Sequence, residues 1–332
     1  MQTQNPDTQL EGIVVKKNLG HYEVNCEDKN TTCVLSANLW KEFETSHSPG
    51  NNRQSVVRVN KVHMDPVAVG DIVSFIPAPD GTGMIQDVLP RRNYLARASA
   101  KPMPGAHAFE QVIAANIDQV VPVFAAADPE PKWHLLDRYI VSAESYSIPS
   151  LVVITKVDLL NQNSAYYELM IAVERYRQIG YEVILTSSKE GDGLDDLKAA
   201  LKGKRSVLVG KSGVGKTTLL NALEPGLGLR VKAVNQTTGK GRHTTTHLEL
   251  FPLAIGGGII DTPGVREFGL YDLEPEDLAY FFPEIKPFIG QCKFGMSCQH
   301  EDEPGCAVRQ GVMDGMISPY RYKSYLRLKA DL

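Results

Sequence analysis

A glycine-rich segment in the second half of the chain has the residue types and spacing of a phosphate-binding loop. Residues 210–217 read Gly-Lys-Ser-Gly-Val-Gly-Lys-Thr, between an apolar run at 206–209 and a helix-like run that begins at Thr218. In such a loop, backbone N–H groups surround phosphate oxygens and the helix N-terminus adds positive potential. Lys216 is expected to reach the β- and γ-phosphates, and Thr217 to offer its hydroxyl to Mg²⁺. The predicted phosphate-binding residues are Gly210, Lys211, Ser212, Gly213, Val214, Gly215, Lys216, Thr217 and Thr218.

A second motif supplies a carboxylate for the same magnesium ion. Asp261, Thr262, Pro263 and Gly264 follow an apolar run, so that Asp261 stands at the end of an expected strand. A carboxylate there can hold the Mg²⁺ shell, and Gly264 can offer its N–H to the γ-phosphate. Taken alone, these four residues could form an ordinary turn. Their position after a phosphate loop favours the magnesium role.

A third motif has the chemistry needed to read a guanine base. Residues 155–158, Thr-Lys-Val-Asp, follow the apolar run 151–154. A carboxylate at Asp158 can accept from N1–H and the 2-amino group of guanine, a donor pair that adenine lacks, while the Lys156 stem lies along the base. Two serines after another apolar run would bring backbone N–H groups near guanine O6, although such a pair is also typical of a loop. The predicted guanine-binding residues are Thr155, Lys156, Val157, Asp158, Ser187 and Ser188.

Three cysteines and a histidine near the end of the chain have the spacing of a metal site. They are Cys292, Cys298, His300 and Cys306. Three thiolates and an imidazole form a closed tetrahedral set for one structural Zn²⁺, with no position left for water. The alternative is a group of buried reduced cysteines beside a surface histidine. Cys26 and Cys33 have no such neighbours and are expected inside a barrel rather than on a metal.

Composition limits the class of protein. The chain has 332 residues, 42% of them hydrophobic, which suggests two or three domains. Its net charge of -4 argues against coating nucleic acid through bulk positive charge, so any RNA contact must be regional. The polar N-terminus, the absence of a membrane-length apolar run and the odd total of five cysteines predict a cytoplasmic protein without membrane contact.

The elements that must position these motifs fall into three regions. Alternating apolar residues predict five short strands in the first region, at 12–17, 21–26, 56–62, 71–76 and 84–89. Closing them into a small barrel removes the sheet edges, with the polar stretch 42–54 as an exposed loop. A basic segment at 90–105 then reads as a solvated connector.

The second and third regions are richer in helices. Apolar runs alternate with helical segments such as 133–145 and 167–179, which implies a parallel sheet covered by helices on both faces. After about residue 269 the pattern changes to a helix at 275–282, the cysteine and histidine cluster, and a final helix. Ser318 is the expected cap of that helix and Pro319 its first residue.

The order of the motifs is unusual. The guanine-reading elements at 155 and 187 precede the phosphate loop at 210, the reverse of the order in ordinary GTPases. This is the order of a circular permutation, which a fold tolerates when its termini lie close together. Together with the strand-rich front region, the segments GRHTTT, DTPGVREFGL and CKFGMSCQHEDEPGCAV resemble the ribosome small subunit-dependent GTPase A family over nearly the whole chain.

The resemblance implies a multidomain protein. It implies an N-terminal OB-type RNA-binding β-barrel at 1–92, a linker at 93–109, a circularly permuted α/β P-loop GTPase domain at 110–270 and a C-terminal, mainly helical zinc-binding domain at 271–332. The implied activity is hydrolysis of GTP with Mg²⁺, in a monomer that also carries one structural Zn²⁺. The implied partners are the small (30S) ribosomal subunit and its 16S rRNA, which would stimulate hydrolysis during a late maturation checkpoint or release step.

Hydrolysis needs a group that orients the attacking water. The residue after Gly264 is Val265, whose side chain can neither donate nor accept a hydrogen bond. The resemblance points instead to His243 as the catalytic residue, and to Thr245 or Thr246 as a further Mg²⁺ ligand. Judged without the resemblance, a lone histidine such as His243 is more often an incidental surface residue.

Candidates for RNA contact lie at both ends of the chain. Those on the barrel are Lys16, Lys17, His21, Tyr22 and Arg58, each of which also suits a charged solvent face. Those on the last helix are Arg321, Lys323, Arg327 and Lys329, interleaved with tyrosines. That helix suits contact with an RNA backbone, or packing as an amphipathic helix on the zinc-binding domain.

Two other classes of function remain open from the residues. One is an RNA-binding module in which hydrolysis merely resets affinity. The other is a permuted ATPase or metabolite kinase, which requires that residues 155–158 do not read guanine.

Overall fold

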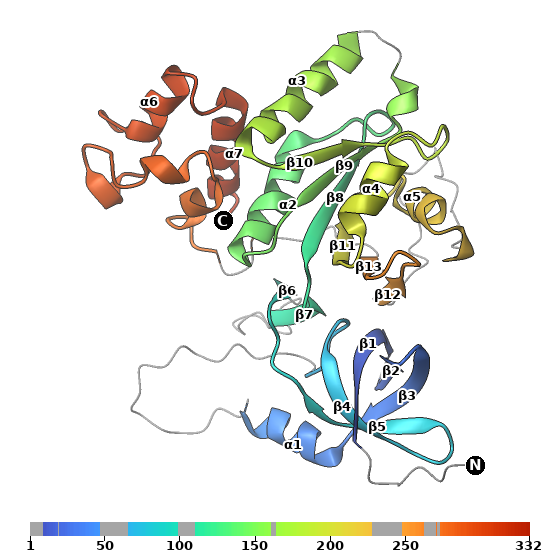
Figure 1. Ribbon diagram of the computed structural model, residues 1–332. Helices are drawn as coiled ribbons and strands as arrows, with labels where there is room; N and C mark the ends of the chain where they lie inside the picture. The colour runs from blue at the N-terminus through green and yellow to red at the C-terminus, as the bar shows by residue number, and fades with distance from the viewer. Residues whose placement is uncertain are drawn as a thin grey trace, which may run out of the picture. The chain divides into compact units, whose positions relative to one another are not determined.

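The computed structural model describes residues 9–18, 20–46, 66–98, 110–160, 164–227, 248–261, 270 and 273–332. The chain divides into two compact units (Figure 1). The first unit comprises Met1–Asp118, Leu201–Val207 and Arg242–Glu267. The second unit comprises Gln119–Ala200, Leu208–Gly241 and Phe268–Leu332. Both units are therefore assembled from segments that lie far apart in the sequence.

The N-terminal strands of the first unit form a closed barrel. They are β1 (Leu10–Asn18), β2 (His21–Cys26), β3 (Lys29–Leu35), β4 (Ile72–Pro77) and β5 (Thr82–Val88). β1 pairs antiparallel with both β2 and β4, β2 pairs with β3, β4 pairs with β5, and β3 runs parallel to β5. Each strand has two neighbours within the barrel, so the closed sheet leaves no edge.

Alternate residues of these strands fill the barrel. Val14, Val24, Phe75 and Ile85 are buried, while their chain neighbours are more exposed. Gly20 makes the turn between β1 and β2 with a φ of 72°, which favours glycine. The period-two alternation that predicts the strands therefore matches the alternation of side chains between the barrel interior and the barrel exterior.

Two parts of the barrel region differ from the sequence-based expectation. The third barrel strand is β3, whose polar residues hide its alternation; the strand expected at 56–62 lies outside the described residues. A helix, α1 (Ala37–Ser46), occupies the start of the stretch expected as a loop at 42–54. Ser36 explains the start of this helix, because its hydroxyl accepts from the Leu39 N–H at 3.2 Å.

Four further strands belong to the first unit. β6 (Tyr94–Ala98) pairs antiparallel with β7 (Glu110–Ala115), and β12 (Glu249–Pro252) pairs antiparallel with β13 (Gly258–Asp261). β6 lies in the segment 93–109 that the sequence predicts as a linker. Of its residues whose burial is described, Leu95 and Ala96 are buried next to one another rather than at alternate positions.

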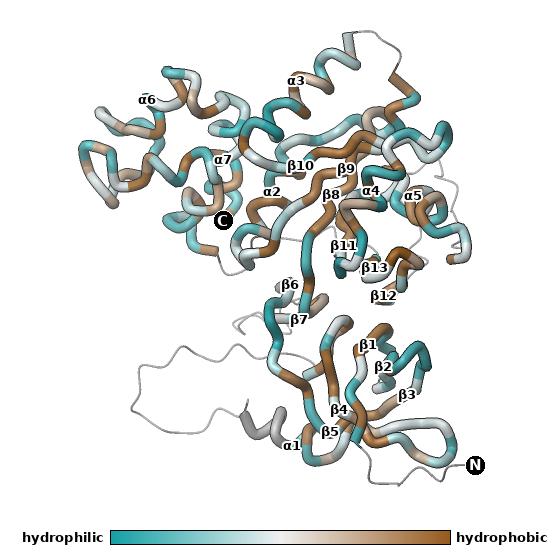
Figure 2. The backbone as a smooth tube through the Cα atoms, in the orientation of Figure 1, coloured by the Kyte–Doolittle hydropathy of each residue, from teal (hydrophilic) through white to brown (hydrophobic). Residues whose placement is uncertain are grey.

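The second unit contains a parallel sheet, as expected. β8 (Gln119–Ala125), β9 (Leu151–Thr155) and β10 (Glu182–Leu185) are parallel neighbours in that order. Every residue of β8 and β9 is buried, and Figure 2 shows both as largely hydrophobic. The helices are α2 (Trp133–Ser145), α3 (Ser164–Ile179), α4 (Leu194–Leu201) and α5 (Lys216–Leu223), with short 3₁₀ turns at Val157–Leu159 and Pro225–Leu227. β11 (Arg205–Val209) begins in the first unit and ends in the second.

The C-terminal part of the second unit is built from short helices. It contains 3₁₀ turns at Leu278–Phe281, Lys286–Phe288 and Gly295–Ser297, followed by α6 (Ala307–Met313) and α7 (Pro319–Ala330). The helix expected at 275–282 is thus only a 3₁₀ turn, whereas Ser318 and Pro319 begin α7 as predicted. The expected fold class, a barrel, an α/β domain and a cysteine and histidine cluster, is confirmed.

A buried arginine joins α7 to the helices of the sheet. Arg321 is 1% exposed and forms ion pairs with Asp137 of α2 and Glu284, each at 2.5 Å. Its guanidinium also lies over the Phe282 ring at 4.6 Å, and Tyr176 of α3 donates to Asp137 at 2.7 Å. α2, α3 and α7 therefore share one buried polar network.

Among the described residues, no helix is both long enough and apolar enough to cross a membrane.

Candidate functional site

The phosphate-loop motif connects β11 to α5, as its sequence predicts. The strand ends at Val209 and the helix begins at Lys216. A Cβ on Gly210 would collide with the Val123 carbonyl, and Gly215 has a φ of 95°, so both positions favour glycine. Val214 is buried and anchors the loop between these glycines.

Lys216 folds back over the loop. Its ammonium donates to the Gly210 carbonyl at 2.7 Å and to the Lys211 carbonyl at 3.1 Å. Thr217 is half-buried as the second residue of α5, and Thr218 is exposed. The lysine, the helix N-terminus and the glycine backbone form the arrangement that binds nucleotide phosphates in P-loop proteins.

Two hydrogen bonds join residues 155–158 to this loop. Thr155, at the end of β9, donates through its hydroxyl to the Val214 carbonyl at 2.5 Å. Lys156 donates to the Gly213 carbonyl at 2.8 Å and also to the Asp128 carbonyl. Segments nearly 60 residues apart in the sequence thus meet at the carboxyl ends of parallel strands, where open α/β sheets bind ligands.

Ser187 orients the Asp158 carboxylate. The Ser187 hydroxyl donates to Asp158 Oδ1 at 2.7 Å and accepts from the Glu190 N–H at 3.1 Å. The Ser187 N–H donates to the Asp192 carbonyl at 3.0 Å, so it is engaged within its own turn rather than directed at a ligand. The sequence indicated a backbone role for Ser187, and the contribution of its hydroxyl was missed because nothing local identifies Asp158 as its partner. Ser188 is half-buried beside it.

The remaining predicted nucleotide residues divide between the first unit and the part of the chain outside the described residues. Asp261 is the last residue of β13, in the first unit, where it pairs in register with Glu249. His243, Thr245, Thr246 and Gly264 lie outside the described residues.

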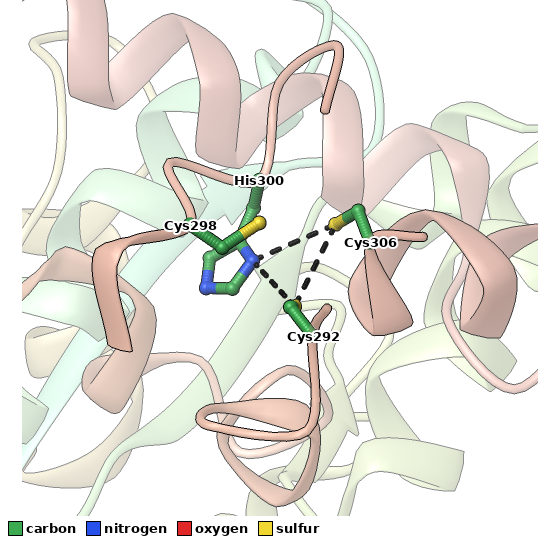
Figure 3. A group of neighbouring side chains, drawn as sticks. All are labelled: Cys292, Cys298, His300 and Cys306. Atoms are coloured by element: carbon green, nitrogen blue, oxygen red, sulfur yellow. Dashed lines mark hydrogen bonds between the residues drawn. The ribbon is translucent and has the colours of Figure 1, made fainter. Parts of the chain in front are cut away.

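The four predicted zinc ligands meet in one buried cluster (Figure 3). Their ligand atoms all lie within 4.8 Å of one another. His300 Nδ1 is 3.5 Å from Cys292 Sγ and 3.6 Å from Cys306 Sγ. Bonds of about 2.3 Å to sulfur and about 2.0 Å to nitrogen place tetrahedral donors roughly 3.5 to 3.8 Å apart. The cluster, Cys298 included, therefore fits a tetrahedral Zn²⁺ with only small movements.

The surroundings of the cluster favour bound thiolates. The Ala307 N–H donates to Cys292 Sγ at 3.2 Å, and the Arg309 N–H to Cys306 Sγ at 3.5 Å. Burial raises the pKa of Cys298 to about 12 and raises the pKa of Cys306. Coordination to Zn²⁺ offsets this effect, since a coordinated thiol is deprotonated.

A second set of residues holds the loop that carries His300. The loop places His300 at a φ of 61°. Tyr322 donates to the His300 carbonyl at 2.7 Å, Lys329 donates to the Gln299 carbonyl at 2.8 Å, and Glu303 accepts from the Gln299 N–H at 2.7 Å. Sequence reasoning missed this support, although Tyr322 and Lys329 stand seven residues apart on one face of α7.

Several candidates for RNA contact are corrected by their surroundings. Arg321 and Tyr22 are buried, and the Lys329 side chain is 9% exposed in the network around Gln299. Lys323 and Arg327 remain exposed on the opposite face of α7, while Arg58 lies outside the described residues. Of the two alternatives for the last helix, the structure therefore shows the amphipathic helix that packs on the C-terminal region. Its outer face is basic.

Comparison with known proteins agrees with this arrangement. A family model described as RsgA GTPase matches residues 88–271. The small ribosomal subunit biogenesis GTPase RsgA of Bacteroides fragilis is 37% identical over 97% of each chain, and that of Ectopseudomonas mendocina is 42% identical over 91% of this chain and 85% of its own.

Solved structures are similar over the whole length. YjeQ from Thermotoga maritima has a TM-score of 0.74 and 32% identity, covering 98% of this chain and 99% of its own. YloQ, described as a circularly permuted GTPase, has a TM-score of 0.69 and 32% identity, covering 100% and 97%. This chain therefore belongs to the RsgA GTPase family and is a circularly permuted GTPase that hydrolyses GTP.

Proposed function

We propose that this GTPase acts in biogenesis of the small (30S) ribosomal subunit, in the cytoplasm and as a monomer. In this proposal it binds the subunit and its 16S rRNA, is stimulated by them, and works as a nucleotide-controlled checkpoint or release factor in late maturation. The observation that carries the proposal is the pair of hydrogen bonds from Thr155 and Lys156 to the phosphate loop. They join the guanine motif to the loop in a chain that matches proteins named for small-subunit biogenesis along nearly its full length.

The phosphate side of the site would use residues from three segments. On binding GTP, the Lys216 ammonium would exchange the Gly210 and Lys211 carbonyls for phosphate oxygens, while the loop N–H groups and Thr218 hold the remaining oxygens. Mg²⁺ bound with GTP would neutralise phosphate charge. Its proposed protein ligands are the hydroxyl of Thr217 and the hydroxyl of either Thr245 or Thr246. The Asp261 carboxylate would hold the coordination shell of the ion.

The base side of the site would select guanine. Asp158 would accept from N1–H and the 2-amino group, and its hydrogen bond from Ser187 fixes the carboxylate in advance. The Ser188 N–H would face O6, since the N–H of Ser187 is engaged by Asp192. Adenine offers the reverse pattern of donors and acceptors, which would leave Asp158 facing a lone pair.

His243 is the proposed water-orienting residue. One imidazole nitrogen can hold the attacking water, a task that Val265 cannot perform. His243→Ala is expected to abolish subunit-stimulated turnover while nucleotide affinity is kept. Near-normal stimulated turnover in that variant would remove His243 from the mechanism.

The proposed function is tested by two measurements on the full chain. GTP turnover is measured alone, with purified small subunits, and with large subunits as the control; stimulation by small subunits only is expected. Small-subunit affinity is then compared with GDP and with a non-hydrolysable GTP analogue. Equal affinities in the two states would exclude a nucleotide-controlled checkpoint.

A further inference from the structure

Cationic side chains from three elements of the second unit gather around the start of α2. Lys132 immediately precedes α2, Lys211 is the second residue of the phosphate loop, and Arg327 lies on the outer face of α7. Lys323 lies one turn before Arg327 on the same face of that helix. These four residues are exposed, belong to the second unit, and are called the basic strip below.

A pocket of about 230 Å³ joins the start of α2 to the phosphate loop. Its lining includes the buried side chains of Phe124 and Val214 and the exposed side chains of Glu130, Lys132 and Lys211. The two lysines therefore line the same space, although they belong to segments that lie far apart in the sequence.

An ion pair between α2 and α7 brings the α7 end of the strip to the same place. Arg138 Nη2 lies 3.2 Å from Asp331 Oδ2. His134 is four residues before Arg138, and Arg327 is four residues before Asp331. Residues four apart share one face of a helix, so His134 and Arg327 lie on the two faces that this ion pair joins.

The electrostatics of His134 agree with this arrangement. Burial lowers the pKa of His134, and three positive charges lower it further. They belong to Arg327, Lys132 and Lys211, which come from α7, the start of α2 and the phosphate loop. Asp137 opposes them weakly. Three cations from separate segments thus act on one imidazole ring.

Two of the carboxylates around these helices are neutralised by ion pairs. Asp331 is paired with Arg138, and the buried Asp137 is paired with Arg321. Glu130 is the exposed carboxylate that lines the pocket together with the two lysines. The strip therefore keeps an excess of positive charge.

The other end of the strip carries an exposed aromatic ring. Tyr320 is 70% exposed and lies on the same face of α7 as Lys323 and Arg327. The guanidinium carbon of Arg175 in α3 lies 4.2 Å from the centre of the Tyr320 ring. Lysine and arginine bind phosphates, while tyrosine rings and guanidinium planes stack on bases. This combination suits a nucleic acid better than an acidic protein.

We propose that the basic strip is a docking surface for the sugar–phosphate backbone of RNA. The whole chain has a net charge of -4, so its attraction for RNA must come from such a region. Contacts of this kind do not depend on base sequence and weaken as salt concentration rises. The inference rests on the proposed function, because it names the surface that meets the RNA of the small subunit.

The first test measures binding of the full chain to a labelled RNA duplex by fluorescence anisotropy, between about 50 and 200 mM salt. Arg327→Gln and Lys132→Gln are each expected to weaken binding roughly three- to tenfold. Each should also reduce the slope of log affinity against log salt by about 1, since one phosphate contact is lost.

Lys198→Gln is the matched control for the loss of one positive charge. Lys198 lies on α4 in the same unit, 3.8 Å from Asp195. Figure 1 shows α4 and α7 separated by the strands β8, β9 and β10. Affinity for the duplex is expected to change less than about twofold in this variant.

A change of opposite sign guards against effects of poor folding. Glu130→Gln removes the negative charge that lies beside Lys132 and Lys211, so it is expected to strengthen duplex binding roughly twofold. A variant that was merely destabilised would not bind RNA more tightly than the natural protein.

The second test titrates GTP turnover with purified small subunits. In Arg327→Gln the subunit concentration that gives half-maximal stimulation is expected to rise roughly three- to tenfold. The maximal rate should be unchanged, because a docking residue contributes to the affinity of the complex and not to the chemical step.

The outcomes separate the two proposals. Unchanged duplex affinity in both Arg327→Gln and Lys132→Gln, or an equal loss in Lys198→Gln, would overturn the docking surface. Unchanged duplex affinity together with weaker binding of small subunits would also overturn it, since the strip would then meet an acidic protein. The expected losses for the duplex in a protein that small subunits do not stimulate would support the RNA surface and reject the proposed function.

Discussion

The barrel and the C-terminal region reach stability by different means. The barrel closes through strand pairing around an apolar core that includes Val14, Val73, Phe75 and Ile85. The C-terminal region has only short helices, and its core contains three of the four predicted zinc-ligand side chains together with Phe282 and Tyr325. Regular backbone pairing satisfies its own polar groups, whereas irregular segments need ligands and buried ion pairs to fix them.

This difference predicts where each kind of change acts. Removing a ligand or a charge should damage the C-terminal region out of proportion to the atoms removed. Removing atoms from the barrel should cost little more than the packing that is lost.

The largest effect is expected from the zinc site. Cys298→Ala should abolish tight Zn²⁺ binding and the amide protection of residues 292–313, because structural zinc contributes roughly 10–16 kcal/mol of apparent binding energy in small domains. Zinc content by mass spectrometry and hydrogen exchange measure this. Cys33→Ala is the matched control. Cys33 is also a buried thiol, and burial raises its pKa to about 11, but no group of metal-ligating side chains among the described residues includes it. Loss of barrel protection in Cys298→Ala would contradict the division between the two regions.

The next effect is expected from the buried ion network. Arg321→Met should lower the free energy of unfolding of the second unit by about 3–5 kcal/mol, because Asp137 and Glu284 are left buried without a counterion. Denaturant unfolding followed by hydrogen exchange measures the change in each unit. Lys323→Met on the exposed face of α7 is the control, with an expected effect within about 0.5 kcal/mol.

A smaller effect is expected from the barrel core. Ile85→Val removes one methylene from a fully buried position of β5 and should cost about 0.5–1.5 kcal/mol. The barrel strands should show faster hydrogen exchange, and the zinc content should stay unchanged. A coupled loss of zinc would show that the two regions do not stabilise independently.

The smallest effect is expected from the ion pair between β1 and β12. Lys16→Met should cost less than about 1 kcal/mol, because both side chains are partly exposed. The hydrogen bond to Glu249 raises the pKa of Lys16 above its ordinary 10.5, so the pair stabilises fully below pH 10.5 and is lost as the pH rises through the raised pKa. Denaturation midpoints at pH 7 and pH 11, with and without 1 M salt, measure this. A difference between Lys16→Met and the natural protein that neither pH 11 nor 1 M salt reduces would exclude the ion pair as its cause.

Local patterns predicted much of the fold and of the site. Period-two alternation predicted four of the barrel strands, and the phosphate-loop spacing predicted the β11–α5 connection to within two residues. The clustering of Cys292, Cys298, His300 and Cys306 was predicted because their spacing alone restricts their geometry. These features are encoded within a few neighbouring residues, which a single sequence displays directly.

The features that escaped prediction depend on partners distant in the sequence. From the sequence alone, Arg321 is expected to be an exposed basic residue. Its buried position depends on Asp137, which lies 184 residues earlier in the chain. The Ser187 hydroxyl gains its role only from Asp158, 29 residues away. β3 lacks a clear hydrophobic period because its buried positions are Thr31 and Cys33, and its pairing with β2 and β5 shows that it is a strand.

α7 also affects how this protein is made. It emerges from the ribosome after every other described element, and it carries both Arg321, the counterion of α2, and Tyr322 and Lys329, the supports of the His300 loop. Until those residues are synthesised, Asp137 and Glu284 of the nascent chain have no counterion. The loop that carries His300 also lacks its supporting hydrogen bonds. Chains released before α7 would therefore lack a stable second unit and be exposed to proteolysis, so that a lasting product requires synthesis through α7.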